Sequence, residues 1–141
     1  MDSNTLEAWF NEVWGNGNLA LIDSIFAPDA QANGLMSNAA VGPKDFHDLV
    51  PAMLRLVRNV DVKLEQHLTA GDWMSVLLRF TGLSARDGRP VDFTAQVMGR
   101  MTESGQFTEV HNNVDFISLF EQLGHLPQDT LALCLTGEVL Q

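Results

Sequence analysis

Several residue types that common architectures depend on are scarce in this sequence. Its single cysteine, Cys134, excludes an internal disulfide and a cysteine-rich zinc site. Eight Lys and Arg stand against eighteen Asp and Glu, and the formal charge of −10 disfavours nucleic acid and anionic membranes as partners. No apolar run approaches the roughly 18 residues of a membrane span, and we expect no signal peptide. These features favour a cytoplasmic, single-domain globular protein.

The N-terminal part of the chain carries a helical period. Apolar residues recur at helical spacing over 6–14, and Asn4 with Glu7 three residues later forms a predicted capping pair. A second, shorter helix is predicted over 18–26. Each helix needs an apolar surface to cover, because amphipathic helices are stabilised mainly by packing.

A third helix is predicted from Gly42-Pro43 to about residue 57, after a weak strand near 30–36. Pro51 lies inside this helix, where it removes a backbone donor, so we expect a kink or a split there. The helices therefore occupy most of the first 57 residues.

The period changes to two beyond this point, which predicts strands. Turn signals at Gly71-Asp72, Asp87-Gly88 and Ser104-Gly105 separate four strands, which makes an antiparallel meander with one apolar face. Helices first and strands later indicate an α+β fold. The predicted core contains Phe10, Trp14, Ile22, Phe26, Leu49, Leu64, Val76, Phe80 and Phe93. Of the histidines, His67 is placed on the polar face of its strand.

The last predicted strand lies in FTEVHNNVDF, residues 107–116, and carries the most unusual pattern. At a two-residue period Glu109, His111, Asn113 and Asp115 share one face, with partly apolar residues opposite. A carboxyl in apolar surroundings can exchange protons near neutral pH, and imidazole does so unaided. Asp115 has an alternative role as the cap of a following helix. No second His or Cys stands at a metal-binding spacing, so we expect no metal site.

Five segments in order resemble the SnoaL-like polyketide cyclases of the NTF2-like superfamily. They are EVWGNGNLALIDSIFAPDA, GPKDFHDLV, AGDWMSV, ESGQFTEVHNNVD and LFEQLGHLP. The resemblance covers about residues 6–127. It implies one domain over 1–127, which leaves 128–141 as a C-terminal extension of unassigned role.

The resemblance implies a cone, in which a curved antiparallel sheet carries the N-terminal helices on its concave face. It also implies a homodimer with a deep apolar pocket and cofactor-free chemistry. Glu109 and Asp115 match the family's last strand, where the Asp acts as general acid or base. His111 replaces the usual Trp, and Asn33 stands where many relatives have His.

On this basis we expect a cofactor-free cyclase, isomerase or lyase that acts on a small, largely apolar, polyketide-like carbonyl compound. Its proton-transfer residues would be Asp115 and His111, on a polar row that faces the pocket. The substrate-binding residues would be Glu109, Asn113, Asn33, Trp14, Phe93 and Val97. One alternative is a non-catalytic binder that uses the same pocket, and another is an interaction module that uses the convex sheet face.

The sequence contains no tyrosine, which excludes two mechanisms known in this fold. Ketosteroid isomerase stabilises its enolate with a Tyr hydroxyl and a protonated Asp. A site like that of scytalone dehydratase also depends on Tyr. The Asp-Arg-Asp arrangement of limonene epoxide hydrolase is excluded as well, because neither Arg79 nor Arg100 has an Asp at the required spacing.

Overall fold

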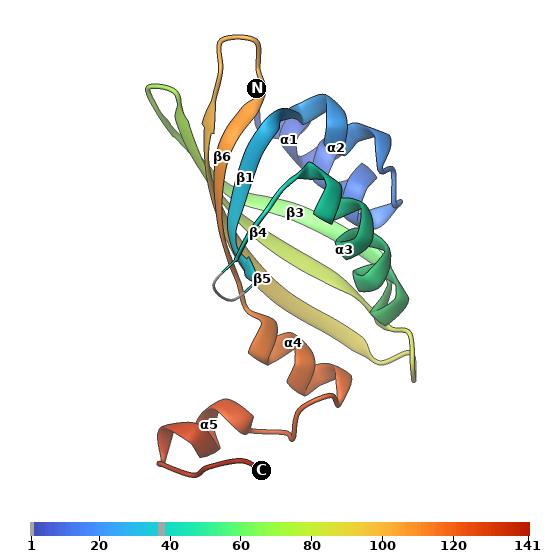
Figure 1. Cartoon of the computed structure of the whole chain (residues 1–141). Coiled ribbons are helices and arrows are strands. Elements are labelled where there is room, and N and C mark those ends of the chain that lie inside the picture. Colours follow the sequence, from blue (N-terminus) through green and yellow to red (C-terminus); the bar gives the residue numbers. More distant parts are fainter. Residues whose placement is uncertain (1, 37–38) are drawn as a thin grey trace.

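The computed structural model describes residues 2–36 and 39–141 as a curved sheet with helices across one face (Figure 1). The helices are α1 (Ser3–Phe10), α2 (Ala20–Ile25), α3 (Pro43–Leu56), α4 (Phe116–Leu123) and α5 (Thr130–Leu135), and a π-helical turn at Asn11–Gly15 follows α1. The strands are β1 (Phe26–Met36), β2 (Ala39–Val41), β3 (Val57–Ala70), β4 (Trp73–Ser84), β5 (Pro90–Met101) and β6 (Phe107–Val114).

The six strands lie in the order β2-β1-β6-β5-β4-β3. Strands β3 to β6 form the predicted antiparallel meander, and the α+β class with helices on the concave face is confirmed. The expectation of a wholly antiparallel sheet is wrong at one place, because β1 runs parallel to β6. The chain between them includes β2, α3 and strands β3 to β5, which is long enough for a parallel pairing.

The helix termini differ from the prediction in detail. Asp2, and not Asn4, caps α1, since its Oδ1 accepts a hydrogen bond of 2.8 Å from the backbone N–H of Thr5. Helix α3 runs without a split through Pro51. Its start is stabilised by Asp45, whose Oδ2 accepts a hydrogen bond of 2.8 Å from the N–H of Gly42.

The core lies between the sheet and the helices. Six of the nine predicted core residues are buried: Phe10, Ile22, Phe26, Val76, Phe80 and Phe93. The other three, Trp14, Leu49 and Leu64, are partly buried and pack against this core. Phe80 and Phe93 stack at 5.0 Å between ring centroids, so the faces of β4 and β5 are as predicted.

A bulge in β3 between Leu64 and Gln66 reverses which side chains face the helices. Leu68 is 67% exposed, although its two-residue spacing from Val60, Val62 and Leu64 predicts that it shares their apolar face. His67 takes the inner side, where its Nδ1 and the Ser3 hydroxyl are hydrogen-bonded at 3.0 Å. Within the described residues its Nε2 is buried without a partner. The predicted exposed position of His67 is therefore wrong.

Strand β3 is an edge of the sheet, and α1 with its π-helical turn covers part of that edge. Asn11 behaves like a peptide group toward Val62: its Nδ2 donates to Val62 O at 2.8 Å, and its Oδ1 accepts from Val62 N at 2.9 Å. Glu7 Oε2 accepts from Leu64 N at 2.9 Å. These bonds satisfy backbone groups that an open edge would leave unpaired.

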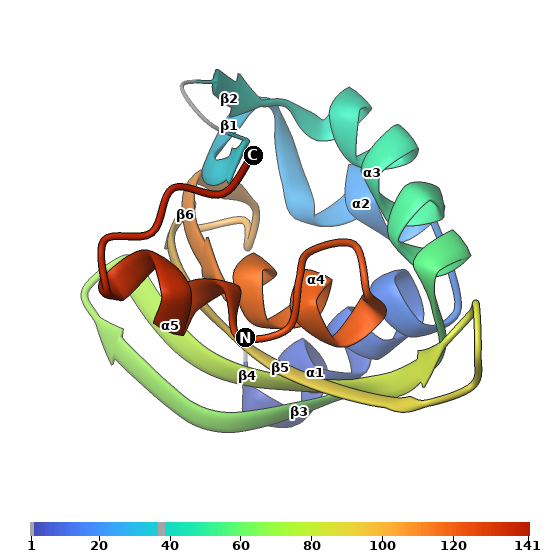
Figure 2. The same ribbon diagram turned by 90° about the horizontal axis from the view of Figure 1, so that it is seen from below.

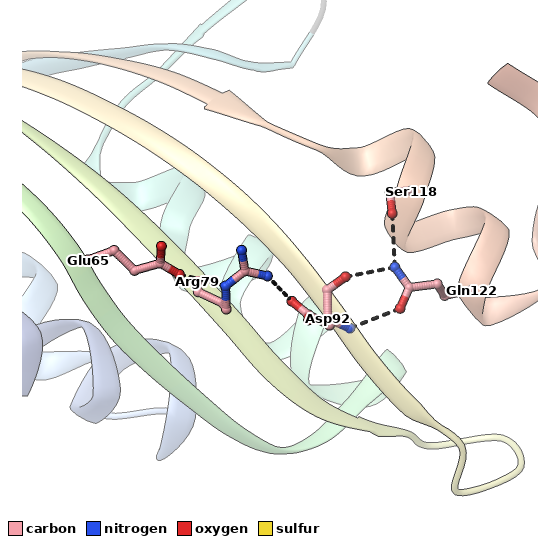
Figure 3. Close-up of polar contacts among 5 residues, drawn as sticks. All are labelled: Glu65, Arg79, Asp92, Ser118 and Gln122. Atoms are coloured by element: carbon pink, nitrogen blue, oxygen red, sulfur yellow. Dashed lines mark hydrogen bonds and ion pairs between the residues drawn. The ribbon is translucent and has the colours of Figure 1, made fainter. Parts of the chain in front are cut away.

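A side-chain amide also holds α4 on β5, through two hydrogen bonds to the backbone (Figure 3). Gln122 Oε1 accepts from Asp92 N at 2.9 Å, and Gln122 Nε2 donates to Asp92 O at 2.8 Å. The Asp92 side chain accepts from Arg79 at 2.7 Å, and Arg79 also donates to Glu65. Helix α4 consequently lies across the open end of the cone, between the sheet and α3 (Figure 2).

We predict that Asn11→Ala lowers the free energy of unfolding by about 1–3 kcal/mol, because it leaves partly buried backbone groups of Val62 unpaired. Asn18→Ala, at an exposed position of the same segment, is the control and should change stability by less than about 0.5 kcal/mol. Urea unfolding of both variants measures the difference. Equal stability of the two variants would contradict the role assigned to Asn11.

Candidate functional site

A mainly apolar cavity lies between the concave face of the sheet and the helices. Its volume is about 80 Å³. Nine of its twenty described lining residues are aromatic: Trp9, Phe10, Trp14, Phe26, Phe46, Phe80, Phe93, Phe107 and Phe116. The others are Met53, Val57, Val60, Met74, Leu78, Thr81, Ala95, Val97, Val110, Asn112 and Val114.

Few polar groups reach this cavity. No ionisable side chain is among its described lining residues, whose polar groups are two indole N–H groups, Thr81 and Asn112. The indole N–H of Trp9 is already used, because it donates to Leu21 O at 3.1 Å. Thr81 is exposed, whereas Asn112 is half-buried. The interior is therefore suited to an uncharged molecule, since burying an unpaired charge is costly.

The polar row of β6 faces away from the cavity, so the prediction that it looks into the pocket is wrong. Val110, Asn112 and Val114 line the cavity, which places the alternating Glu109, His111 and Asn113 on the outer face of the sheet. The physical reason is burial. Facing the valines inward removes apolar surface from water, whereas the opposite choice would expose the valines and take Glu109 and His111 out of water.

His111 and Glu109 instead belong to a cluster on the outer face of the sheet. His111 Nε2 donates to Glu109 Oε2 at 2.6 Å, and the His111 ring stacks on Trp73 at 6.3 Å. The guanidinium of Arg100 lies 5.3 Å from the Trp73 ring centroid and pairs with Asp72 at 3.2 Å. We call these five residues the outer cluster. It lies across the thickness of the sheet from the cavity.

Asp115 is exposed and caps α4. Its Oδ1 accepts a hydrogen bond of 3.1 Å from Ser118 N. The expected buried position of this carboxyl is wrong, and the capping alternative is what the structure shows. Asp115 nevertheless stands between Val114 and Phe116, which both line the cavity, so its backbone lies at the rim.

The remaining predicted binding residues divide into two groups. Trp14, Phe93 and Val97 line the cavity. Asn33 does not; it is paired in register with His111. Sequence reasoning missed Asn112 as a cavity residue. The signal was present, because Asn112 shares its two-residue period with Val110 and Val114.

Two other features bear on the site. Among residues 2–36 and 39–141, no three His, Cys, Asp or Glu side chains are grouped as metal ligands. In the same part of the chain no helix is long and apolar enough to cross a membrane.

The sequence matches the family model of the SnoaL-like domain over residues 6–110. Since this match spans most of the chain, the protein belongs to the SnoaL-like family. The match ends within β6, so α4 and α5 lie beyond it. No curated protein matches the sequence.

Solved structures show the same fold. A putative polyketide cyclase from Bacillus cereus ATCC 10987 is 25% identical, with a TM-score of 0.73 over 82% of this chain and 76% of that one. AclR, a putative hydroxylase from Streptomyces galilaeus, is 16% identical, with a TM-score of 0.73 over 96% and 92%. IdmH, a putative polyketide cyclase from Streptomyces antibioticus, is 18% identical, with a TM-score of 0.73 over 88% and 99%.

We predict that Asp115→Ala lowers the free energy of unfolding by about 1 kcal/mol, because α4 loses its cap. Asp115→Asn should change stability little, since Asn caps helices about as well as Asp does. Urea unfolding at neutral pH measures both. Equal losses in the two variants would show that the charge of Asp115, and not its capping bond, matters.

Proposed function

We propose that this protein binds a small, uncharged, largely apolar molecule in its cavity without transforming it. The observation that carries the proposal is the lining: among its twenty described residues none is ionisable. A ligand there is held by aromatic and aliphatic walls, with few polar groups to orient it. This is the second of the functions expected from the sequence.

The geometry supports binding more than proton transfer. A general acid or base must come within about 2.6–3.2 Å of the proton it moves, directly or through one water. His111 is on the outer face of the sheet, in a hydrogen bond with Glu109. Asp115 is at the rim, but its carboxylate is engaged with Ser118 N. Cyclase or isomerase chemistry would require Asp115 to leave this bond and turn inward.

The family supports the class of ligand. Two of the similar structures are described as putative polyketide cyclases. A polyketide-like ligand would be a carbonyl compound with apolar surface, which suits these walls. A cavity of about 80 Å³ is smaller than an engineered apolar cavity of about 150 Å³ that binds benzene. A ligand with even one ring therefore requires wall side chains to move outward.

We predict that toluene raises the melting temperature of the wild-type protein, because a ligand that binds only the folded state stabilises it. Ala95→Leu should reduce this rise by adding carbon atoms to a buried wall position. Gln96→Leu, exposed on the opposite face of the same strand, is the control and should keep the rise. Thermal unfolding with and without toluene measures all three proteins. No rise in the wild type would refute binding of this ligand class.

We also propose that the outer face of the sheet pairs with a second copy of the chain. Two of the exposed large apolar side chains lie on this face, on β3 and β5 with β4 between them: Leu68 is 67% exposed and Met98 is 45% exposed. Strand register places Leu68, Ser75, Met98 and His111 in one row. The described helices cover only the other face of the sheet (Figure 1). The two large apolar side chains of this row, flanked by polar groups, are suited to a self-complementary interface.

We predict that the protein has a mass about twice the 15.5 kDa of one chain, as measured by light scattering at micromolar concentration. Met98→Lys should shift the mass toward that of the monomer, because it replaces one of the two large apolar side chains of this row with a charged one. Lys is tolerated at an exposed strand position, so folding should be retained, as circular dichroism can confirm. A wild-type mass near that of one chain would refute the dimer.

A further inference from the structure

Asn112 stands out in the cavity as a half-buried amide in an otherwise apolar part of the wall. On β6 it lies between Val110 and Val114, which also line the cavity. On β5 its register partner is Val97, another lining residue. An amide at such a place is costly unless its donors and acceptor find partners.

One hydrogen bond sets the orientation of this amide. Asn112 Nδ2 donates to the backbone oxygen of Asn33 at 3.1 Å. A carbonyl oxygen only accepts, so the NH₂ group must be the part that points to β1. The other part, Oδ1, is then an acceptor without a hydrogen bond to the described residues, and it is not fully buried, so it is open to a donor from outside the chain.

Close packing of β1 against this residue limits its freedom to reorient. A Cβ built on Gly34 would lie 1.9 Å from the backbone oxygen of Asn112, so only glycine permits this approach. Gly34 also has φ of +89°, in the region that favours glycine. Since Asn33 precedes Gly34 in the chain, its backbone oxygen is held beside Asn112. The acceptor that orients the amide is thus in place before any ligand binds.

We propose that Asn112 makes the cavity selective for ligands that carry a hydroxyl or N–H group, which donates to its Oδ1. This deepens the proposed function and rests on it. A hydrocarbon of the same shape would displace water from Oδ1 and leave it unpaired, at a cost of about 1–3 kcal/mol. That cost corresponds to a change of about 5-fold to 150-fold, in favour of the donor-bearing ligand, in the ratio of the two dissociation constants.

Phenol and toluene test this selectivity, because they have nearly the same shape and differ by a hydroxyl in place of a methyl group. The quantity to measure is the ratio of the Kd of toluene to the Kd of phenol, by titration calorimetry or NMR. Asn112→Leu should lower this ratio at least about 5-fold, because a leucine accepts no hydrogen bond. Asn113→Leu, the next residue and on the outer face, is the control and should leave the ratio unchanged.

The outcomes separate this inference from the function on which it rests. An unchanged ratio in Asn112→Leu, with both ligands still bound, overturns the role of Asn112 and leaves the binding cavity intact. Failure of both ligands to bind the wild type overturns the proposed function and the selectivity together. If Asn112→Leu does not fold, Asn112→Val takes its place, because Val110 and Val114 beside it are valines that already line the cavity; the same fall in the ratio supports the inference, and an unchanged ratio overturns it.

Discussion

The alternation of side chains along β6 is the constraint on which the character of the cavity depends. In a strand, successive residues point to opposite faces, so turning one residue inward turns every second residue inward with it. Val110 and Val114 face the core, and Asn112 between them must do the same. Glu109 and His111 are carried to the outer face by the same rule. One choice of face therefore removes every ionisable group of this strand from the cavity.

Amide side chains complete the sheet at three places where strand pairing stops. Asn11 pairs with the backbone of β3 at the sheet edge. Gln122 pairs with Asp92 on β5, beyond the end of β6. Asn112 donates to β1, close to where β1 and β6 cease to pair in register. A primary amide has a donor and an acceptor like a peptide group, so it can replace a missing strand without introducing charge.

Membership of the SnoaL-like family establishes the scaffold, whereas the chemistry depends on a few wall residues. The curved sheet and its helices produce a cavity in any sequence that adopts this fold, and loop and wall substitutions decide what occurs inside. In this protein Asp115, to which the resemblance assigns the role of acid or base, is the N-cap of α4. The walls that remain offer shape, aromatic surface and one oriented amide. This composition of the walls is the reason for proposing that the protein binds a ligand without transferring a proton.

Periodicity was sufficient to predict the α+β class, the order of the first three helices and of the meander strands, and most of the core, because apolar spacing reports local conformation directly. It also showed which residues of β6 share a face. It did not predict β2 or α5. It could not show which of the two faces is buried, since that depends on the strands and helices packed on either side. The bulge after Leu64 exchanges the faces on which His67 and Leu68 lie. The residues of β3 alone could not show this, because a bulge arises from the pairing of two strands. The position of Asp115 was likewise settled by α4, whose free N–H groups compete with a cavity for the same carboxylate.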